Sequence, residues 1–348
     1  MEISCIMSNY NTPAEYLHAS IQSILSQTMG DFELIIIDDG STDASLEIIK
    51  DYAQKDSRIV LVENGKNCGL PYSLNRGIDK AQGRYIARMD TDDISLPDRF
   101  RLQKEYLDSH SDIDVLGGFA LCFGKQKGYS ITPFYDFEHC KCAMLYASSL
   151  PHPTVMMRRD FLQNNSLRYN ETFRSAQDLE LWSRCLEYGK VEVLDSVLLL
   201  YRIHGNQISV GKREQQKQFV KQVCQRQISN HIKKNVTDEE LELHLILSGY
   251  NKMDENNAIQ LFRWVEQVIK SSDNYYNGKA LKDIMNLRFY MLLVKSNINL
   301  FMKLKICFLQ RSILNLNFLK YYIYRKRVIK KLSIPEKYRQ EIYMKTGE

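Results

Sequence analysis

The sequence is poor in proline and glycine and has no long apolar run, and these absences exclude several classes of protein. Its 348 residues include only 7 prolines and 16 glycines, too few for a collagen-like or linker-rich chain. No window of about 20 residues is free of charge, so we expect no membrane-spanning helix. Glu2 and Ser4 interrupt the start of the chain and no A-x-A site follows, so we expect no signal peptide.

Two common nucleotide-binding motifs are also missing. No G-x-G-x-x-G follows the first apolar run, which removes the main support for a dinucleotide dehydrogenase, and no G-x-x-x-x-G-K-[ST] marks a P-loop enzyme. The eight cysteines have no repeating spacing, and we expect them to be reduced thiols of a cytosolic protein. His139-Cys140-Lys141-Cys142 has the spacing of half a zinc site, but no second Cys or His pair completes it.

The composition is that of an ordinary globular protein with an uneven distribution of charge. Its 44% apolar residues suffice for a core, and the length predicts two domains. Residues 1–210 contain 21 cations against 29 acids, a net charge of −8, whereas residues 211–348 carry a net charge of +13. Between Asp283 and Glu336 there are eleven Lys or Arg and no acidic residue. We expect an acidic catalytic half and a basic tail that meets an anionic partner.

The first hundred residues alternate short apolar runs with amphipathic segments. The apolar runs predict strands at 3–7, 33–37, 58–62 and 84–89. Leucines and isoleucines at helical spacing predict helices between these strands, and we expect the second helix to begin near Ser41 or Thr42. This β-α-β-α-β-α-β order predicts an open, mostly parallel sheet with helices on both faces.

The rest of the chain is less regular. We expect short strands near 113–123, helices near 136–147 and 178–188, and a strand near 191–202. Residues 212–348 predict helices only. The predicted domains are therefore a catalytic domain over residues 1–210 and a basic, mainly helical region over residues 211–348, with the boundary near Gly205–Gly211.

Acidic clusters follow two of the predicted strands, at the sheet edge where ligands bind in such folds. Asp90-Thr91-Asp92 can aim two carboxylates at one point, and divalent cations prefer oxygen ligands. The alternative is that Asp92 and Asp93 cap a helix that begins near Leu96-Pro97-Asp98. The cluster Asp38-Asp39-Gly40-Ser41-Thr42-Asp43 either caps a helix or presents a carboxylate to a base or ribose.

A third acidic cluster, Gln177-Asp178-Leu179-Glu180-Leu181-Trp182, predicts a helix start. Asp178 is either the N-cap of this helix or a base presented toward the crevice at the strand ends.

The motifs, in this order, make the sequence similar to the family 2 glycosyltransferases with the GT-A fold. The resemblance runs from residue 3 to about 209 and rests on Tyr10-Asn11, Ser26-Gln27-Thr28, Asp38-Asp39-Gly40-Ser41-Thr42-Asp43, Asn67-x-Gly69, Asn75-Arg76-Gly77, Ala81-x-Gly83-x-Tyr85, Asp90-x-Asp92-Asp93, Pro97-Asp98-Arg99, Pro151-His152-Pro153, Gln177-Asp178-x-Glu180-Leu181-Trp182 and Tyr201-Arg202-x-His204. It implies a Rossmann-like, mostly parallel mixed sheet flanked by helices, followed by a C-terminal helical extension.

The resemblance also implies roles for individual residues. Asp92 would bind Mn²⁺ or Mg²⁺ directly, and Asp90 would approach the ribose and the metal. Asp178 matches the general base that deprotonates the acceptor hydroxyl. The remaining implied donor contacts are Asp39 with uracil, Ser8 and Asn67 beside it, Arg76 near the nucleotide, and His204 near the diphosphate or metal. For His204, an equal alternative is a hydrogen-bonded histidine at a strand end.

The sequence departs from the family pattern at two points. Gln177 stands where an acidic residue often precedes the base, and Leu181-Trp182-Ser183-Arg184 does not match the Q-x-x-R-W element of processive synthases. The resemblance and these departures together imply inverting, metal-dependent transfer of a single sugar from a UDP-sugar. The acceptor we expect is a glycan or a lipid-linked molecule, in bacterial surface-polysaccharide or lipooligosaccharide assembly. The alternatives are a nucleotidyltransferase and a non-catalytic GT-A-like scaffold that binds a glycan or partner.

Residues 286–331 mix aromatic and aliphatic side chains with cations such as Arg325-Lys326-Arg327. They predict either a helical bundle with a solvated cationic face or an element that lies on an anionic membrane surface. The latter would place the protein in the cytoplasm, peripheral to the inner face of the membrane. Nucleic-acid binding would also suit the charge, but no recognised fold supports it, and we expect no nucleic-acid partner.

Overall fold

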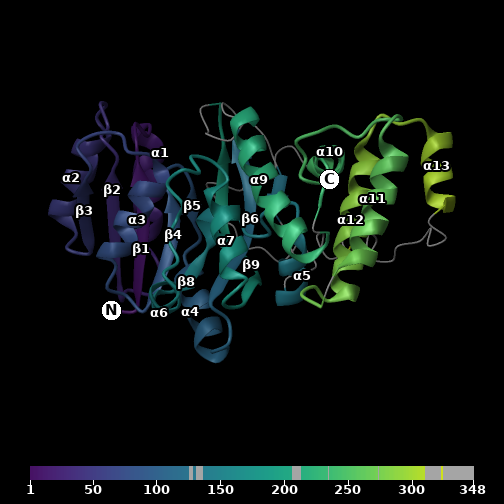
Figure 1. Cartoon of the computed structure of the whole chain (residues 1–348). Helices are drawn as coiled ribbons and strands as arrows, with labels where there is room; N and C mark the ends of the chain where they lie inside the picture. Colours follow the sequence, from purple (N-terminus) through teal and green to yellow (C-terminus); the bar gives the residue numbers. More distant parts are fainter. Residues whose placement is uncertain are drawn as a thin grey trace. The chain divides into compact units, whose positions relative to one another are not determined.

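The computed structural model describes residues 1–124, 128–130, 136–205, 213–233, 235–272 and 274–309, together with residue 323. These residues form two compact units (Figure 1). The described residues of the first unit are 1–124, 128–130 and 150–205, and those of the second are 136–149, 213–233, 235–272, 274–309 and 323. The predicted boundary near Gly205–Gly211 falls mostly outside the described residues, so the division into 1–210 and 211–348 stays a prediction.

The first unit is built on a mixed sheet of nine strands, which confirms the predicted fold class. The four predicted N-terminal strands are parallel: β1 (Ile3–Asn9), β2 (Phe32–Asp38), β3 (Ile59–Glu63) and β4 (Tyr85–Asp90). The sheet continues through β8 (Met156–Arg158), β6 (Val115–Gly124), β9 (Val191–Ile203) and β5 (Ile94–Ser95), while β7 (Gly128–Ser130) pairs with β6. The strands β8 and β5 were not predicted, because two or three residues show no periodicity.

Helices connect and cover these strands, and all but α6 and η1 fall where the sequence predicts a helix. They are α1 (Ala14–Leu25), α2 (Ser45–Lys55), α3 (Leu70–Lys80), α4 (Arg99–Ser109), α6 (Arg159–Asn164) and α7 (Gln177–Cys185), with a short 3-10 helix, η1 (His152–Thr154). The strand β2 is buried along its whole length, as expected of a parallel strand covered on both faces.

Strand register brings the carboxyl ends of the parallel strands to one edge of the sheet. Ser8 on β1 lies opposite Ile37 on β2 and Asp90 on β4. Asp38, one residue further along β2, lies opposite Glu63 on β3. The predicted acidic clusters therefore follow strands that end at a common edge.

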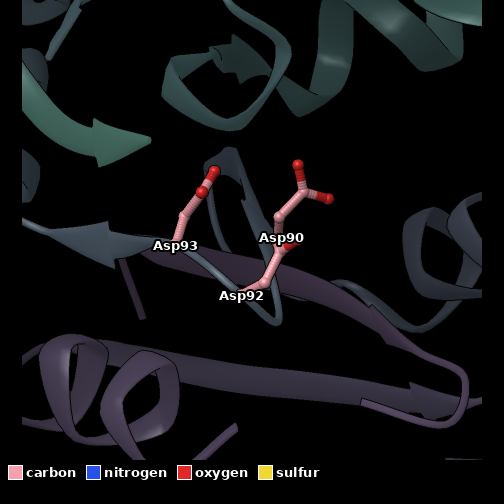
Figure 2. A group of neighbouring side chains, drawn as sticks. All are labelled: Asp90, Asp92 and Asp93. Carbon is pink, nitrogen blue, oxygen red and sulfur yellow. The ribbon is translucent and has the colours of Figure 1, made fainter. Parts of the chain in front are cut away.

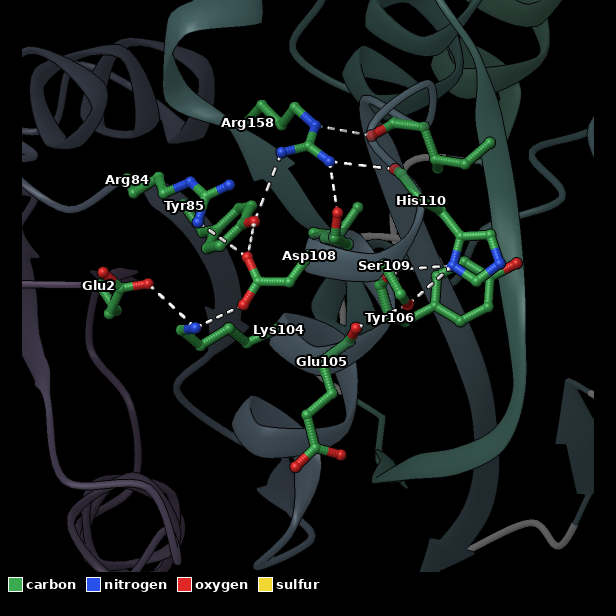
Figure 3. Close-up of polar contacts among 12 residues, drawn as sticks. Glu2, Arg84, Tyr85, Lys104, Glu105, Tyr106, Asp108, Ser109, His110 and Arg158 are labelled. Carbon is green, nitrogen blue, oxygen red and sulfur yellow. Dashed lines mark hydrogen bonds and ion pairs between the residues drawn. The ribbon is translucent and has the colours of Figure 1, made fainter.

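The opposite end of β4 is fastened to α4 by a polar network (Figure 3). The Asp108 carboxylate accepts hydrogen bonds from the Tyr85 hydroxyl at 2.7 Å and from Arg84 at 2.8 Å. The guanidinium of Arg158 donates to the Leu107 carbonyl at 2.6 Å. These contacts lie at the start of β4, at the other end of the strand from Asp90. They therefore fix the position of the strand without contacting Asp90.

The start of α2 is later than predicted. The helix begins at Ser45 and not at Ser41 or Thr42. The Ser41 hydroxyl donates to Asp38 at 2.6 Å, and the Thr42 N–H donates to Asn11 at 2.8 Å. These bonds hold residues 41 and 42 in a turn, because polar side chains compete with the helix for backbone groups.

The suggestion that Asp92 and Asp93 cap the following helix is wrong. This helix, α4, begins at Arg99 with Asp98 in the N-cap position, and Asp98 makes no side-chain capping bond. The Phe100 N–H donates instead to the side-chain oxygen of Gln27, at 3.1 Å.

The second unit is helical throughout its described residues, as predicted. Its helices are α5 (Phe137–Ala143), α9 (Arg213–His231), α10 (Asp238–Leu247), α11 (Ala258–Ser271), α12 (Gly278–Lys295) and α13 (Leu300–Leu309). His244 on α10 links three parts of this unit through buried polar contacts. One ring nitrogen accepts from the Trp264 indole on α11 at 3.2 Å, and the other lies 2.7 Å from the carbonyl of Leu145, which follows α5. Among the described residues, no helix has the length and apolarity needed to cross a bilayer.

Candidate active site

Three carboxylates gather at the turn that connects β4 and β5 (Figure 2). Asp90, Asp92 and Asp93 each have an oxygen within 4.8 Å of the others. Asp90 ends β4 and Asp93 directly precedes β5, so the tight connection itself creates the cluster. Three like charges this close repel one another, so cations must offset the cluster when all three are ionised.

The end of β9 reaches over this turn. His204, which directly follows β9, places Nε2 at 2.8 Å from an Asp92 carboxylate oxygen. The Arg202 N–H donates to Asp93 at 2.8 Å, and its side chain donates to the Asp92 carbonyl at 2.9 Å. The predicted residues Asp92 and His204 are therefore direct neighbours, although 112 positions separate them in the sequence.

Burial and mutual repulsion act on the acids of the cluster. Burial raises the pKa of Asp90, and Arg88, which forms an ion pair with it, opposes this shift. Asp93 is fully buried, and burial together with the charges of Asp92 and Asp90 raises its pKa well above the ordinary range. Such strongly perturbed acids gathered at one place are typical of functional sites.

Asp178 lies in the first turn of α7, close enough to Asp90 for their charges to interact. The N-cap of α7 is Ala176, with a φ of +56°, so the alternative that Asp178 is the N-cap is wrong. Burial raises the pKa of Asp178, while the Leu179 N–H and the charge of Arg88 lower it. Since the charge of Asp178 in turn raises the pKa of Asp90, the two carboxylates lie close enough to influence one another.

Asp39 directly follows β2, and both oxygens of its carboxylate accept hydrogen bonds. Its carboxylate accepts from the Asn64 side chain at 2.6 Å and from the N–H groups of Cys68 and Gly69, both at 2.9 Å. Arg76 donates to the same Asn64 and to the Glu63 carbonyl. Asp39 and Arg76, both of which the sequence analysis assigns to donor binding, therefore hydrogen-bond to the same side chain, that of Asn64.

The remaining predicted donor residues lie at the same edge, without a direct contact to Asp39. Ser8 is half-buried and pairs in register with Asp90, whereas Asn67 is exposed in the loop after β3. This loop packs closely against Gly40, which lies just after β2. The φ of Gly40 is +76°, and a Cβ at this position would stand 2.5 Å from the Lys66 Cα.

The sequence analysis assigned no role to Arg88 or to His152, two buried polar residues whose charges interact. Arg88 is 3% exposed on β4, and the ring of the buried His152 lies 2.7 Å from the Tyr169 hydroxyl. Burial lowers the pKa of His152 well below its usual value, and Arg88 adds to this shift. One signal was available, since Arg88 is a cation in an otherwise apolar strand, on the same face as Asp90 two positions later.

The sheet and its helices form a GT-A-like fold, and comparison with known proteins identifies the family as one of sugar transferases. The sequence model described as Glycosyl transferase family 2 matches residues 4–177, half of the chain, and the protein belongs to this family. An uncharacterized glycosyltransferase of Methanocaldococcus jannaschii is 35% identical over 223 residues, covering 62% of this chain and 76% of the relative. The O-antigen biosynthesis glycosyltransferase WbnJ of Escherichia coli is 34% identical over 213 residues, covering 58% and 80%.

Solved structures with the same fold have much lower sequence identity. TarS residues 1–349 of S. aureus in complex with UDP-GlcNAc superpose with a TM-score of 0.57 at 18% identity, covering 83% of this chain and 87% of TarS 1–349. The mannosyltransferase PcManGT of Pyrobaculum calidifontis, in complex with GDP-Man and Mn²⁺, gives 0.54 at 13% identity, covering 94% and 83%. These likenesses establish the fold alone.

Proposed function

We propose that this glycosyltransferase moves one sugar, with inversion, from a UDP-sugar to a hydroxyl of a glycan or lipid-linked acceptor, with the aid of Mn²⁺ or Mg²⁺. The observation that carries the proposal is the position of Asp178 beside the Asp90-Asp92-Asp93 cluster. A relative named for O-antigen biosynthesis and a structural neighbour that holds UDP-GlcNAc support the substrate class. The pathway we propose is assembly of a bacterial surface polysaccharide or lipooligosaccharide.

The residues present fit a divalent cation. The cluster offers only carboxylate oxygens, the ligands that Mg²⁺ and Mn²⁺ prefer. Asp92 would hold the cation directly, with Asp90 toward the ribose and His204 near the diphosphate. A bound cation would neutralise negative charge that develops on the departing diphosphate.

The chain's own residues would carry the proton and orient the donor. As the acceptor oxygen bonds to the anomeric carbon, Asp178 takes the hydroxyl proton and the bond between that carbon and UDP breaks. Attack opposite the leaving group inverts the configuration. Because burial raises its pKa, the Asp178 carboxylate is a stronger base than an exposed aspartate.

The nucleotide end of the donor would lie at the carboxyl ends of β1, β2 and β3. Asp39 would contact uracil, with Ser8 and Asn67 beside it and Arg76 nearby. The bonds from Asn64 and the backbone hold the Asp39 carboxylate in one orientation before a base arrives. This rigidity lowers the entropy cost of binding.

The test compares Asp178→Asn with wild type in UDP release and product formation, using a panel of UDP-sugars with Mn²⁺. We expect transfer to fall at least about a thousandfold in Asp178→Asn, while UDP binding, followed by thermal shift, stays unchanged. Wild-type kcat should fall on acidification, with a midpoint above the ordinary aspartate pKa, because the base must be ionised.

Two further variants complete this test. Asp92→Asn should lose metal-dependent turnover, and Asp51→Asn, an exposed acid on α2 paired only with Lys55 in the described contacts, should keep full activity. Substantial transfer by Asp178→Asn would refute the base assignment. UDP binding by wild type with no turnover on any donor would favour a non-catalytic scaffold, and release of diphosphate from a nucleoside triphosphate would favour a nucleotidyltransferase.

We also propose that the basic C-terminal part meets an anionic membrane surface, where a lipid-linked acceptor would be found. The described residues that support this are Leu300 and Phe301, which are 72% and 78% exposed at the start of α13. Exposed apolar side chains beside cations are typical of helices that lie in a membrane interface. Of the predicted segment 286–331, residues 286–309 and residue 323 are described, and the rest lies outside the described residues.

A further inference from the structure

Arg88 places a guanidinium inside the acidic site. It is 3% exposed, and its Nη2 forms an ion pair with an Asp90 carboxylate oxygen. Its Nε and Nη1 have no hydrogen-bond partner among the described residues. A buried cation needs a counter-charge, and Asp90 is the acid that Arg88 contacts.

The ion pair between Arg88 and Asp90 limits which carboxylates of the cluster can bind a cation. The Asp90 carboxylate is engaged by Arg88, and the fully buried Asp93 accepts the Arg202 N–H. Asp92, by contrast, is partly exposed, and the group nearest its carboxylate is the His204 ring. The three acids are therefore not equivalent, and Asp92 is the one best placed to bind an ion from solution.

The charge of Arg88 also extends beyond Asp90. It lowers the pKa of Asp178 and of Asp93, so one guanidinium offsets acids from β4, the β4–β5 turn and α7. In a site with little water, a fixed positive charge at this position weakens the attraction of the whole cluster for a second cation.

We propose that Arg88 is a positioning residue that neutralises the acidic cluster from within. It holds Asp90 as its counter-ion, so that the protein alone binds a divalent cation weakly, and the cation binds tightly only together with the diphosphate of the donor. The inference rests on the proposed function, because the diphosphate is that of a nucleotide sugar. By thermodynamic linkage, the cation must strengthen nucleotide binding by the same factor.

The experiment measures Mn²⁺ binding to the full-length protein by electron paramagnetic resonance, with and without UDP. In wild type, UDP should tighten Mn²⁺ binding at least about tenfold. In Arg88→Gln, Mn²⁺ binding without UDP should tighten about fivefold or more, because a positive charge has been removed and Asp90 released. Arg88→Lys keeps the charge and should stay close to wild type.

A double variant guards against misfolding. Arg88→Gln with Asp90→Asn removes both charges, leaves the net charge of the cluster unchanged and leaves neither partner of the pair as an uncompensated buried charge. Its Mn²⁺ affinity without UDP should lie within about threefold of wild type. Circular dichroism and thermal unfolding identify any variant that fails to fold, in which case the double variant decides.

The outcomes separate this inference from the proposed function. Unchanged or weaker Mn²⁺ binding by folded Arg88→Gln overturns the inference alone, as does a loss of more than about tenfold in the double variant, which would make Asp90 itself a ligand. A wild-type protein that binds no Mn²⁺ even with UDP overturns the proposed metal dependence, and this inference with it.

Discussion

Gly40 shows how a single residue allows the loops after β2 and β3 to pack closely together. Its φ of +76° is a conformation that residues with a Cβ rarely adopt, and a Cβ would stand 2.4 Å from the Lys66 carbonyl carbon. Gly40→Ala should lower the free energy of unfolding by about 3 kcal/mol, because strain and a backbone clash add together. Urea denaturation measures this loss.

Gly65 provides the matched control. Its φ is +74°, but a Cβ there would meet no atom within 4 Å. Gly65→Ala should therefore cost only the conformational strain, about 1 kcal/mol. Equal losses in the two variants would contradict the argument that close packing of the two loops requires glycine at position 40.

The residues of the site were predictable to different degrees. Asp90, Asp92 and Asp178 are acids beside strand ends or at a helix start, and their positions follow from local pattern. That His204 contacts Asp92 could not be read from the sequence, because it depends on how β9 returns to β5. Arg88 was overlooked, because an isolated cation in an apolar strand resembles an edge residue until its burial is known.

At the scale of elements, Gln27 holds the end of α1 against the chain that enters α4. Its side-chain N–H₂ donates to the Leu96 carbonyl at 2.8 Å and to the Ser95 hydroxyl at 3.1 Å, and its oxygen caps the Phe100 N–H. Gln27→Ala should lower the free energy of unfolding by about 3 kcal/mol, because buried polar groups lose their partners. Thermal or urea unfolding measures the loss.

Gln22 on the same helix is exposed and serves as the control. Gln22→Ala should change the stability by less than about 0.5 kcal/mol. A comparably small effect of Gln27→Ala would mean that α4 begins at Arg99 without this cap.

The ends of the four parallel strands were predicted to within two residues, because buried β-branched runs are a strong local signal. The short strands β5 and β8 escaped prediction, because distant partners and not their own residues define them. The late start of α2 has the same origin, since Asn11, far along the chain from Thr42, accepts the Thr42 N–H.

For the whole molecule, the distribution of charge leads to a prediction about membranes. The Leu300→Glu/Phe301→Glu double variant should reduce sedimentation with vesicles that contain anionic lipid at least about fivefold, because apolar contact is lost and acids oppose the surface. Neutral vesicles should bind wild type more weakly than anionic ones.

Tyr188→Glu is the control, because Tyr188 is also exposed but lies in the first unit, after α7. It should change vesicle binding by less than about twofold, since a single added acid there is screened. Unchanged binding by the Leu300→Glu/Phe301→Glu variant would remove α13 from the proposed membrane surface.

The sequence by itself determined the alternation of strands and helices over the first hundred residues, the resemblance to the family and the acids at the strand ends, because these depend on patterns within a few neighbouring residues. Only the tertiary structure decided which acids meet. Pairing of β9 with β5 brings His204 to Asp92, and the tertiary fold brings Asp178, at the start of α7, close enough to Asp90 for their charges to interact. The physical reason is that contacts between residues about 90 to 110 positions apart depend on how the whole sheet closes around its core, which no local pattern records.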